Sequence, residues 1–365
     1  MIPSRGCTSI RTLHSGICGK CKVPAIWARD ALLDGDNTSI SKAVPIRGAF
    51  YEAGEVDNLI TSIKEVAPLP FERRVFDANK RAHRAVFQGT LAGATGAAAR
   101  KIAPRLLLSQ LEKVTPGFGA GKLSVESYRR GGPLVVRCIN SWNDRLLPAD
   151  VAGAFEAVEG TECEVDVEKG ADATYVRVRA VGPLEDEEPG KVAPMVGVLS
   201  GSKLYPRCTS CGAPISFQVF NFDLDNGEIT ERDNGIRVVH QATACLETLL
   251  MQIEDDLGDE ARALAIDAEA KYVVRKIESG DYSSEADDEK HRLFDYMSLI
   301  RRRCLGNPIL VDLEGDRLRV RVRNPANPVL LTGRTLGTYS AVMHRPAAAR
   351  TQLGYGTMEV EVTPA

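Results

Sequence analysis

Long apolar runs, a strong charge of one sign and clustered histidines are all missing from this sequence of 365 residues. No apolar run approaches the roughly 18 to 20 residues that cross a bilayer, and the first residues lack the apolar core of a secretory signal. The formal net charge is only −3, which does not indicate a nucleic-acid-binding surface. We therefore expect a cytoplasmic protein with no membrane span and no nucleic-acid partner.

Residue patterns typical of catalysis are also missing. The five histidines show no spacing that suggests a metal box or a catalytic triad. No G-x-G-x-x-G loop follows a predicted strand, and "GFGAGK" (117–122) lacks the spacing and the following Ser or Thr of a phosphate-binding loop. Cys138 and Cys245 lie on apolar faces of a predicted strand and a predicted helix, so we interpret both as buried thiols that pack as small hydrophobic groups. The sequence predicts no catalytic residue.

Cysteine, in contrast, occurs in a repeated pattern. "CGKCKVP" (18–24) is matched by "CTSCGAP" (208–214), and each Cys and Pro is displaced by 190 positions. Without an export signal, nine cysteines favour reduced thiols and metal ligation over disulfides. The candidate ligands, with zinc as the expected metal, are Cys18, Cys21, Cys208 and Cys211.

A closed tetrahedral zinc site needs about four ligands, so one C-x-x-C pair is half a site. Three completions are open. The four cysteines share one metal at a pseudo-twofold axis, each pair recruits Cys7 or His14, or the pairs are degenerate remnants. A redox dithiol and an iron–sulfur centre gain no support, because neither pair opens a helix in a βαβ context and a cluster also needs four donors.

The 190-residue repeat extends well beyond the cysteines. "RCINSWNDRLLPADVAGAFEAV" from Arg137 aligns without gaps with "RVRNPANPVLLTGRTLGTYSAV" from Arg321, at a constant offset of 184. Collinear matches on this scale indicate an internal duplication. We place copy one at residues 1–183, a linker rich in Pro, Gly and acidic residues at 184–202, and copy two at 203–365.

Each copy has the same order of expected elements. A β-ribbon follows the cysteine pair, and in copy two its turn is Asp225-Asn226-Gly227. A helical block comes next, and short alternating strands follow, with an amphipathic helix around Gly153 or Gly337 between them. We therefore predict an α+β fold, in which a duplicated β-ribbon, helical block and small antiparallel sheet pack as a pseudo-dimer.

The last third of each copy resembles the 4-vinyl reductase domain family, also called hydrocarbon-binding domains. The residues that carry the resemblance are Asn140, Ser141, Gly153, Phe155, Gly160 and Glu168 in copy one and Asn324, Gly337 and Tyr339 in copy two. The resemblance implies a helix-lined pocket for a small apolar molecule. Many members ligate zinc through cysteines in this region, but Val151, Leu336 and the stretch 171–175 offer none. The resemblance therefore carries no zinc site into this part of the chain.

The pocket is expected in at least one half. Trp142 has Ala326 as its counterpart in copy two, so a large aromatic side chain is available to form a pocket wall in only one copy. Gly89 and Gly93 allow either another helix or a flat ligand to approach closely, and we count both among the candidate pocket residues, together with Phe155.

Duplication without an acid, base or nucleophile favours binding over turnover. We predict a protein that binds or senses a small hydrophobic molecule and acts through a protein partner. Two alternatives stay open: an accessory or structural subunit of a larger metabolic enzyme complex, and a reductase of a vinyl or aromatic substrate that takes electrons from a partner.

Overall fold

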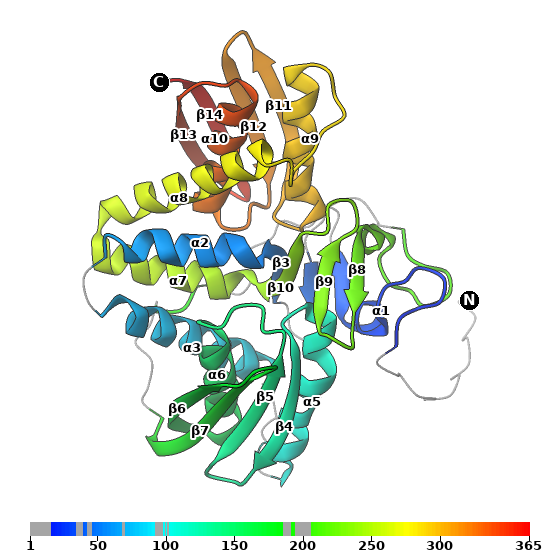
Figure 1. Ribbon diagram of the computed structural model, residues 1–365, viewed down its shortest axis with the longest axis vertical. Helices are drawn as coiled ribbons and strands as arrows, with labels where there is room; N and C mark the ends of the chain where they lie inside the picture. Colours follow the sequence, from blue (N-terminus) through cyan, green and yellow to red (C-terminus); the bar gives the residue numbers. More distant parts are fainter. Residues whose placement is uncertain are drawn as a thin grey trace.

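The structure is a computed structural model that describes residues 16–33, 39–41, 46–67, 70–91, 98, 100, 102–184, 191–193 and 206–365. These residues form an α+β protein with three antiparallel sheets. A central layer lies between two lobes, each built from helices and a four-stranded sheet (Figure 1). The predicted fold class is confirmed. Most of the predicted linker lies outside the described residues, so the boundaries of the two copies stay a prediction.

Both copies contribute to the central layer. Its six-stranded sheet has the order β1-β2-β3-β10-β9-β8. Its elements are α1 (Ala25–Asp30), β1 (Ala31–Leu33), β2 (Ser39–Ser41), β3 (Arg47–Glu52) and α2 (Ala53–Lys64) from copy one, and η1 (Ile215–Val219), β8 (Phe220–Asp223), β9 (Glu228–Glu231), β10 (Arg237–Ala242) and α7 (Thr243–Leu257) from copy two. The predicted turn at 225–227 joins β8 to β9 as an antiparallel hairpin.

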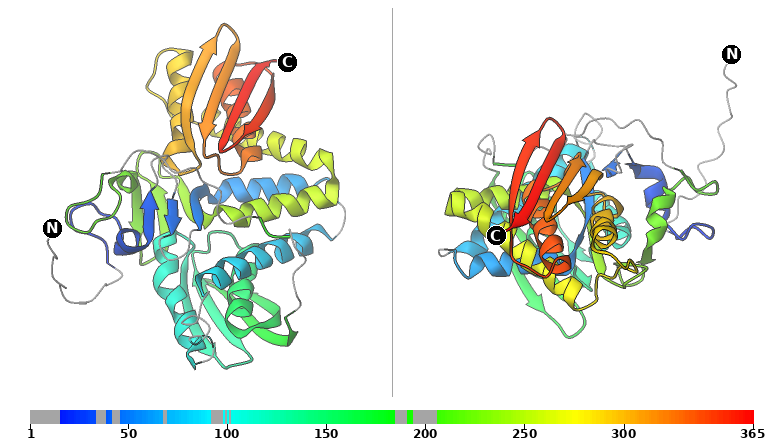
Figure 2. Two further views of the ribbon diagram at one scale, coloured as in Figure 1. Left: turned by 180° about the vertical axis from the view of Figure 1, so that it is seen from behind. Right: turned by 90° about the horizontal axis from the view of Figure 1, so that it is seen from above.

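The two lobes repeat one arrangement. The first lobe contains α3 (Phe71–Thr90), α5 (Pro104–Phe118), β4 (Lys122–Tyr128), β5 (Leu134–Ile139), α6 (Leu147–Glu159), β6 (Thr161–Lys169) and β7 (Thr174–Pro183). The second contains α8 (Asp259–Glu278), α9 (Glu289–Arg302), β11 (Asn307–Glu314), β12 (Arg317–Arg323), α10 (Pro328–Val342), β13 (Ala347–Gly354) and β14 (Thr357–Pro364). Their sheets have matching orders, β4-β5-β7-β6 and β11-β12-β14-β13. Figure 2 shows the second lobe from behind and from above.

A pseudo-twofold axis passes between β3 and β10. In this antiparallel pair Phe50 faces His240, and these two residues are themselves 190 positions apart. The helix that follows the central strand of each copy packs against the next helix of the other copy, α2 on α8 and α7 on α3. The two copies are therefore interlocked through the central layer, as expected for a pseudo-dimer.

The helices around Gly153 and Gly337 are not amphipathic, and this part of the prediction is wrong. Nearly every residue of α6 and α10 is buried, because each lies between a helix of its own copy and its own sheet. A Cβ atom on Gly153 would lie 2.5 Å from the Lys80 carbonyl oxygen of α3, and one on Gly337 would lie 2.4 Å from the Ala270 carbonyl oxygen of α8. Glycine is required at both positions because the helix backbones nearly touch.

Hydrophobic side chains form two buried clusters. One runs through the central layer and the second lobe, and the other fills the first lobe around Phe155 and Val178. Among the described residues there is no helix that is both long and apolar enough to cross a membrane.

Candidate functional site

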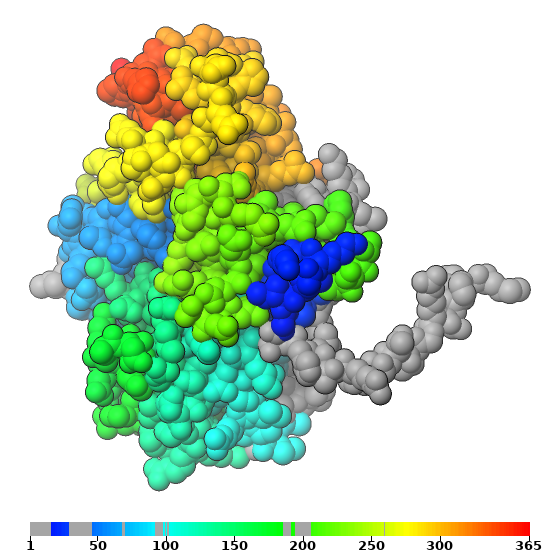
Figure 3. Space-filling view, turned by 45° about the vertical axis from the view of Figure 1, so that its right-hand side comes forward, coloured from blue at the N-terminus to red at the C-terminus, as the bar shows by residue number. Residues whose placement is uncertain are grey.

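The two C-x-x-C segments fold into matching loops that meet on the pseudo-twofold axis. The Cys18 N–H donates to the Val23 carbonyl and the Cys208 N–H to the Ala213 carbonyl, at 3.0 and 2.8 Å. Lys22 and Gly212, again 190 positions apart, both have a left-handed backbone, with φ of 61° and 79°. The segment near the N-terminus lies against the start of copy two on the molecular surface (Figure 3). Sequence spacing and backbone shape therefore agree for the pair of loops.

The four sulfur atoms are close enough to share one metal ion. All four Sγ atoms lie within 4.8 Å of one another, and Cys21 Sγ is 3.5 Å from Cys211 Sγ. Tetrahedral zinc with Zn–S near 2.3 Å sets its sulfurs about 3.8 Å apart, so the donor set fits that geometry. The structure brings the four cysteines together, as the first of the three completions requires. Cys7 and His14 lie outside the described residues.

The thiols of the cluster differ in their electrostatic surroundings. Hydrogen bonds from the backbone N–H groups of Cys211 and Ser210 lower the pKa of Cys208 to about 6, and matching bonds in the first loop lower the pKa of Cys18. Burial raises the pKa of Cys21 to about 12. Each loop thus offers one thiol that ionises readily and one that a cation must help to deprotonate.

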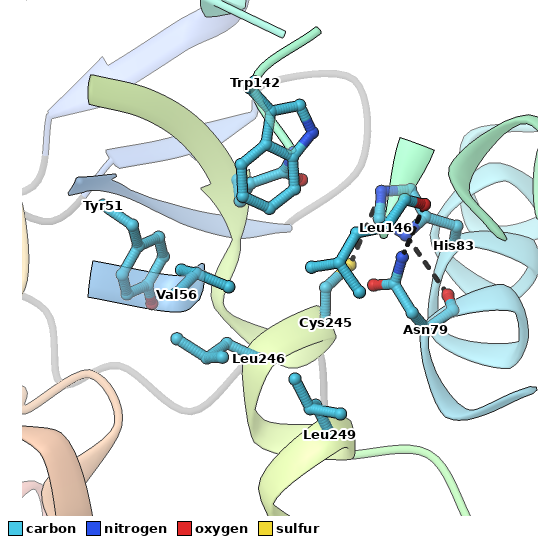
Figure 4. Close-up of a pocket in the computed structure, with 10 residues that line it drawn as sticks. Tyr51, Val56, Asn79, His83, Trp142, Leu146, Cys245, Leu246 and Leu249 are labelled. Atoms are coloured by element: carbon cyan, nitrogen blue, oxygen red, sulfur yellow. Dashed lines mark hydrogen bonds between the residues drawn. The ribbon is translucent and has the colours of Figure 1, made fainter. Parts of the chain in front are cut away.

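A cavity lies where the first lobe meets the central layer, and both copies line it (Figure 4). The lining residues are Tyr51, Val56, Asn79, His83, Trp142, Leu146, Gln241, Cys245, Leu246 and Leu249. Its volume is about 20 Å³, enough for one water molecule. Val56, Leu246 and Leu249 gather on one side of the cavity, and Asn79 and His83 lie on the other. The cavity therefore has an apolar wall and a polar end.

Hydrogen bonds fix the polar end. His83 Nδ1 lies 3.2 Å from both the Asn79 carbonyl oxygen and Asp150 Oδ1. Asn79 Nδ2 donates to Asp150 Oδ1 at 2.6 Å, and Trp142 Nε1 donates to Asp150 Oδ2 at 3.2 Å. Both neighbours of Nδ1 are hydrogen-bond acceptors, so Nδ1 carries a proton. The other ring nitrogen, Nε2, lies 4.0 Å from Sγ of Cys245, a residue of the cavity lining.

Charge at the polar end is carried by the imidazole and Asp150. Burial lowers the pKa of His83, but the negative charge of Asp150, followed by that of Cys245, outweighs this effect and raises the pKa to about 10. The site thus combines a buried imidazolium with a carboxylate that also accepts from an indole and an amide.

The pseudo-symmetric position in the other half is filled by an ionic network. The offsets of 190 and 184 relate Asn79 to Glu269, His83 to Val273, Trp142 to Ala326, Asp150 to Arg334, and Cys245 to Glu55. The Arg334 guanidinium is 2 % exposed, and its Nη2 lies 3.0 Å from Glu55 Oε1 and 3.1 Å from Glu269 Oε1. The cavity counterpart is therefore occupied by protein side chains.

A second buried arginine extends this network. Arg303 Nε donates to Glu231 Oε1 at 2.7 Å, and its guanidinium also bonds Glu52. The Tyr282 hydroxyl oxygen accepts hydrogen bonds from Nη1 of Arg303 and from Nη1 of Arg334, each at 3.3 Å. Burial and the nearby Glu55 raise the pKa of Glu269 well above its usual range. Removing one member of such a buried ionic network would leave its partners buried without an opposite charge, which strongly destabilises a folded protein.

The predicted pocket residues lie in different places. Trp142 lines the cavity. Phe155 is fully buried in the core of the first lobe, and Gly89 lies in the last turn of α3; neither is among the lining residues. Gly93 lies outside the described residues.

Sequence reasoning missed His83 and the role of Asp150. One signal was available: at the aligned positions copy two has Val273 and Arg334, so both residues differ sharply between the copies. A polar residue that only one copy retains is a candidate for function in that copy.

Comparisons with known proteins add little. No family model matches the chain, and no curated protein matches it. Among solved structures, the chain is similar to the phenol-responsive sensory domain of the transcription activator PoxR with phenol, with a TM-score of 0.34 and 18% sequence identity over 40% of this chain and 85% of that one. A likeness this distant carries no argument about function.

Proposed function

We propose that the protein binds one small, mostly apolar molecule that carries a single polar group. The observation that supports this is the cavity, with apolar side chains of both copies on one side and the hydrogen-bonded His83 and Asn79 on the other. Ligand sites commonly combine an apolar wall with a few fixed polar groups. Because both copies line the cavity, an occupant would change how they pack, and a protein partner would read that change.

The cavity must enlarge to take such a ligand. Its volume of about 20 Å³ is far below the roughly 150 Å³ of an engineered cavity that admits benzene. Leu246 and Leu249 belong to α7, and Trp142 belongs to a loop after β5. We propose that rotation of these side chains opens the space, at a cost in packing that the bound ligand offsets.

We propose zinc as the metal of the four-cysteine cluster and a structural role for it. A donor set of four thiols, two from each copy, is typical of closed structural zinc sites. Such an ion would join the two loops at the axis and would supply no chemistry to the cavity. We also propose that the last third of each copy is of the 4-vinyl reductase type; the support is the buried glycine-bearing helix of each lobe.

A pair of ligands equal in size and shape tests the binding proposal. We expect phenol to raise the melting temperature by at least about 2 °C at saturation, by preferential binding to the native state. Toluene, which lacks the hydroxyl, should produce a smaller rise. Absence of a rise with either compound, up to the solubility limit, would contradict the proposal.

Matched variants locate the effect. Leu249→Phe adds bulk on the apolar side of the cavity and should abolish the ligand-dependent rise. Leu108→Ala truncates a side chain that is 1 % exposed in the core of the first lobe and lies outside the cavity lining. It should lower the melting temperature of the free protein but keep the rise that phenol produces.

A further inference from the structure

Among the described residues that line the cavity, Cys245 carries the one thiol, and three features of its surroundings act on it together. Its Sγ lies 4.0 Å from His83 Nε2. It is the third residue of α7, in the helical turn whose N–H groups have no partner within the helix. It also lines the cavity. An imidazole and a helix N-terminus are two surroundings that make a cysteine nucleophilic.

The imidazole is oriented for proton transfer with this sulfur. Nδ1 of His83 faces two acceptors, the Asn79 carbonyl and Asp150 Oδ1, both at 3.2 Å. Nε2 is then the nitrogen that exchanges a proton with Sγ. Cys245, His83 and Asp150 thus take the places of nucleophile, proton-transfer group and orienting carboxylate that are typical of activated cysteines.

Two thiols of the first lobe, Cys138 and Cys163, hydrogen-bond to oxygen atoms and have no imidazole among these contacts. Cys138 bonds only weakly to a backbone carbonyl, at 3.7 Å, and burial raises its pKa to about 12. Cys163 lies 3.4 Å from the carboxylate of Glu156, whose charge adds to burial in raising the pKa of that thiol. The carbonyl beside Cys138 is not a base. The Glu156 carboxylate is already paired with Lys80 and Arg84, so neither contact relays a proton as an imidazole does.

We propose that Cys245 adds covalently to small electron-poor alkenes that enter the cavity, the class that includes α,β-unsaturated ketones. The proton that this pair shares lies on His83 Nε2, so the sulfur acts as a thiolate beside the imidazolium and forms a bond to the β-carbon as the carbon–carbon double bond opens. The resulting enolate takes the proton of Nε2 at its α-carbon, which leaves a thioether and a neutral imidazole. No atom leaves, and no external oxidant or reductant takes part. This inference rests on the proposed ligand cavity and specifies one class of occupant.

Methyl vinyl ketone and its saturated analogue butan-2-one test it on the full-length protein. After a short exposure to the enone, peptide mass mapping should find the mass of one intact enone on Cys245 at least 10-fold faster than on Cys138 or Cys163. Cys245→Ala should remove that adduct. Butan-2-one, which cannot add, should leave the protein mass unchanged.

Two variants separate reactivity from folding and from reversible binding. His83→Gln keeps a polar side chain but cannot relay the proton, so it should slow labelling of Cys245 at least 10-fold. Labelling of Cys138 should be unchanged, which would show that the variant is folded. Labelling of Cys245 no faster than that of Cys138, or unaffected by His83→Gln, overturns the inference. A rise in melting temperature with butan-2-one in Cys245→Ala would show that reversible binding stands even if the addition fails.

Discussion

The cavity and its pseudo-symmetric counterpart occupy equivalent places in the two halves of the chain, and they are built in opposite ways. On one side Asp150 holds His83 and Trp142 around an open space. On the other side Arg334, at the aligned position, fills that space and pairs with Glu55 and Glu269. A duplicated protein can thus keep one half as a candidate binding site and convert the other into a buried ionic brace.

The largest effect on stability is expected from the four-cysteine cluster, because both copies contribute to it. The four cysteines lie together at the axis, so loss of the zinc ion that we propose there would loosen the interlocked copies together. We expect Cys21→Ser, or a strong chelator, to lower the melting temperature by more than about 10 °C, because structural zinc contributes on the order of 10 kcal/mol in small sites. Metal content by elemental analysis and thermal melting provide the measurement.

A matched thiol gives the control for this result. Cys163→Ser removes a half-buried thiol outside the cluster and should leave both the metal content and the effect of chelation unchanged. If chelation leaves the melting temperature of the native chain where it was, the bracing role of the cluster is wrong.

The second largest effect on stability is expected from Arg334, and Asp150 at the aligned position gives the comparison. Arg334→Met leaves Glu55 and Glu269 buried without their cation and should cost about 3–5 kcal/mol. Asp150→Asn keeps most of its hydrogen bonds and is partly solvated, with 15 % of its side chain exposed, so it should cost only about 1–2 kcal/mol. Urea denaturation of both variants measures the difference. Equal costs would show that the filled side is no more dependent on its charges than the open side.

Sequence patterns predicted the parts of this comparison that depend on local chemistry. The C-x-x-C spacing and the Asp-Asn-Gly turn each specify a backbone shape, and copies of one shape imply a pseudo-dimer. The contrast between Trp142 and Ala326 pointed to a cavity in one half only. These features were accessible because neighbouring residues determine them.

The features that the sequence did not predict depend on packing between residues far apart in the chain. Nothing near Cys245 in the sequence reveals that α7 of copy two packs on α3 of copy one and brings this thiol to His83. The same interlocking buries α6 and α10 on nearly all sides, which helical periodicity alone could not show. Phe155 was assigned to the pocket from a motif, but the sheet that covers α6 places it in the core.

The smallest effect concerns the axis itself, where the copies place Phe50 opposite His240. Aromatic rings surround the imidazole, with Trp27 at 4.7 Å and Phe50 at 5.0 Å between ring centroids, and burial lowers its pKa to about 3. The folded protein therefore keeps His240 neutral, whereas the unfolded chain takes up a proton below about pH 6.5. This contribution to the free energy of unfolding is complete above pH 6.5 and is lost as the pH falls toward 3, at up to about 1.4 kcal/mol per pH unit.

His240→Leu should flatten the stability profile between pH 6.5 and pH 5, measured by urea denaturation at each pH. Phe50→Leu truncates the paired ring but removes no titrating group, so it should lower stability and keep the slope. Other ionisable groups are common to all three proteins, so the difference in slope isolates His240. If the slope is the same in all three, the imidazole is protonated in the native state, and the axis then holds a buried positive charge on the copy-two side alone.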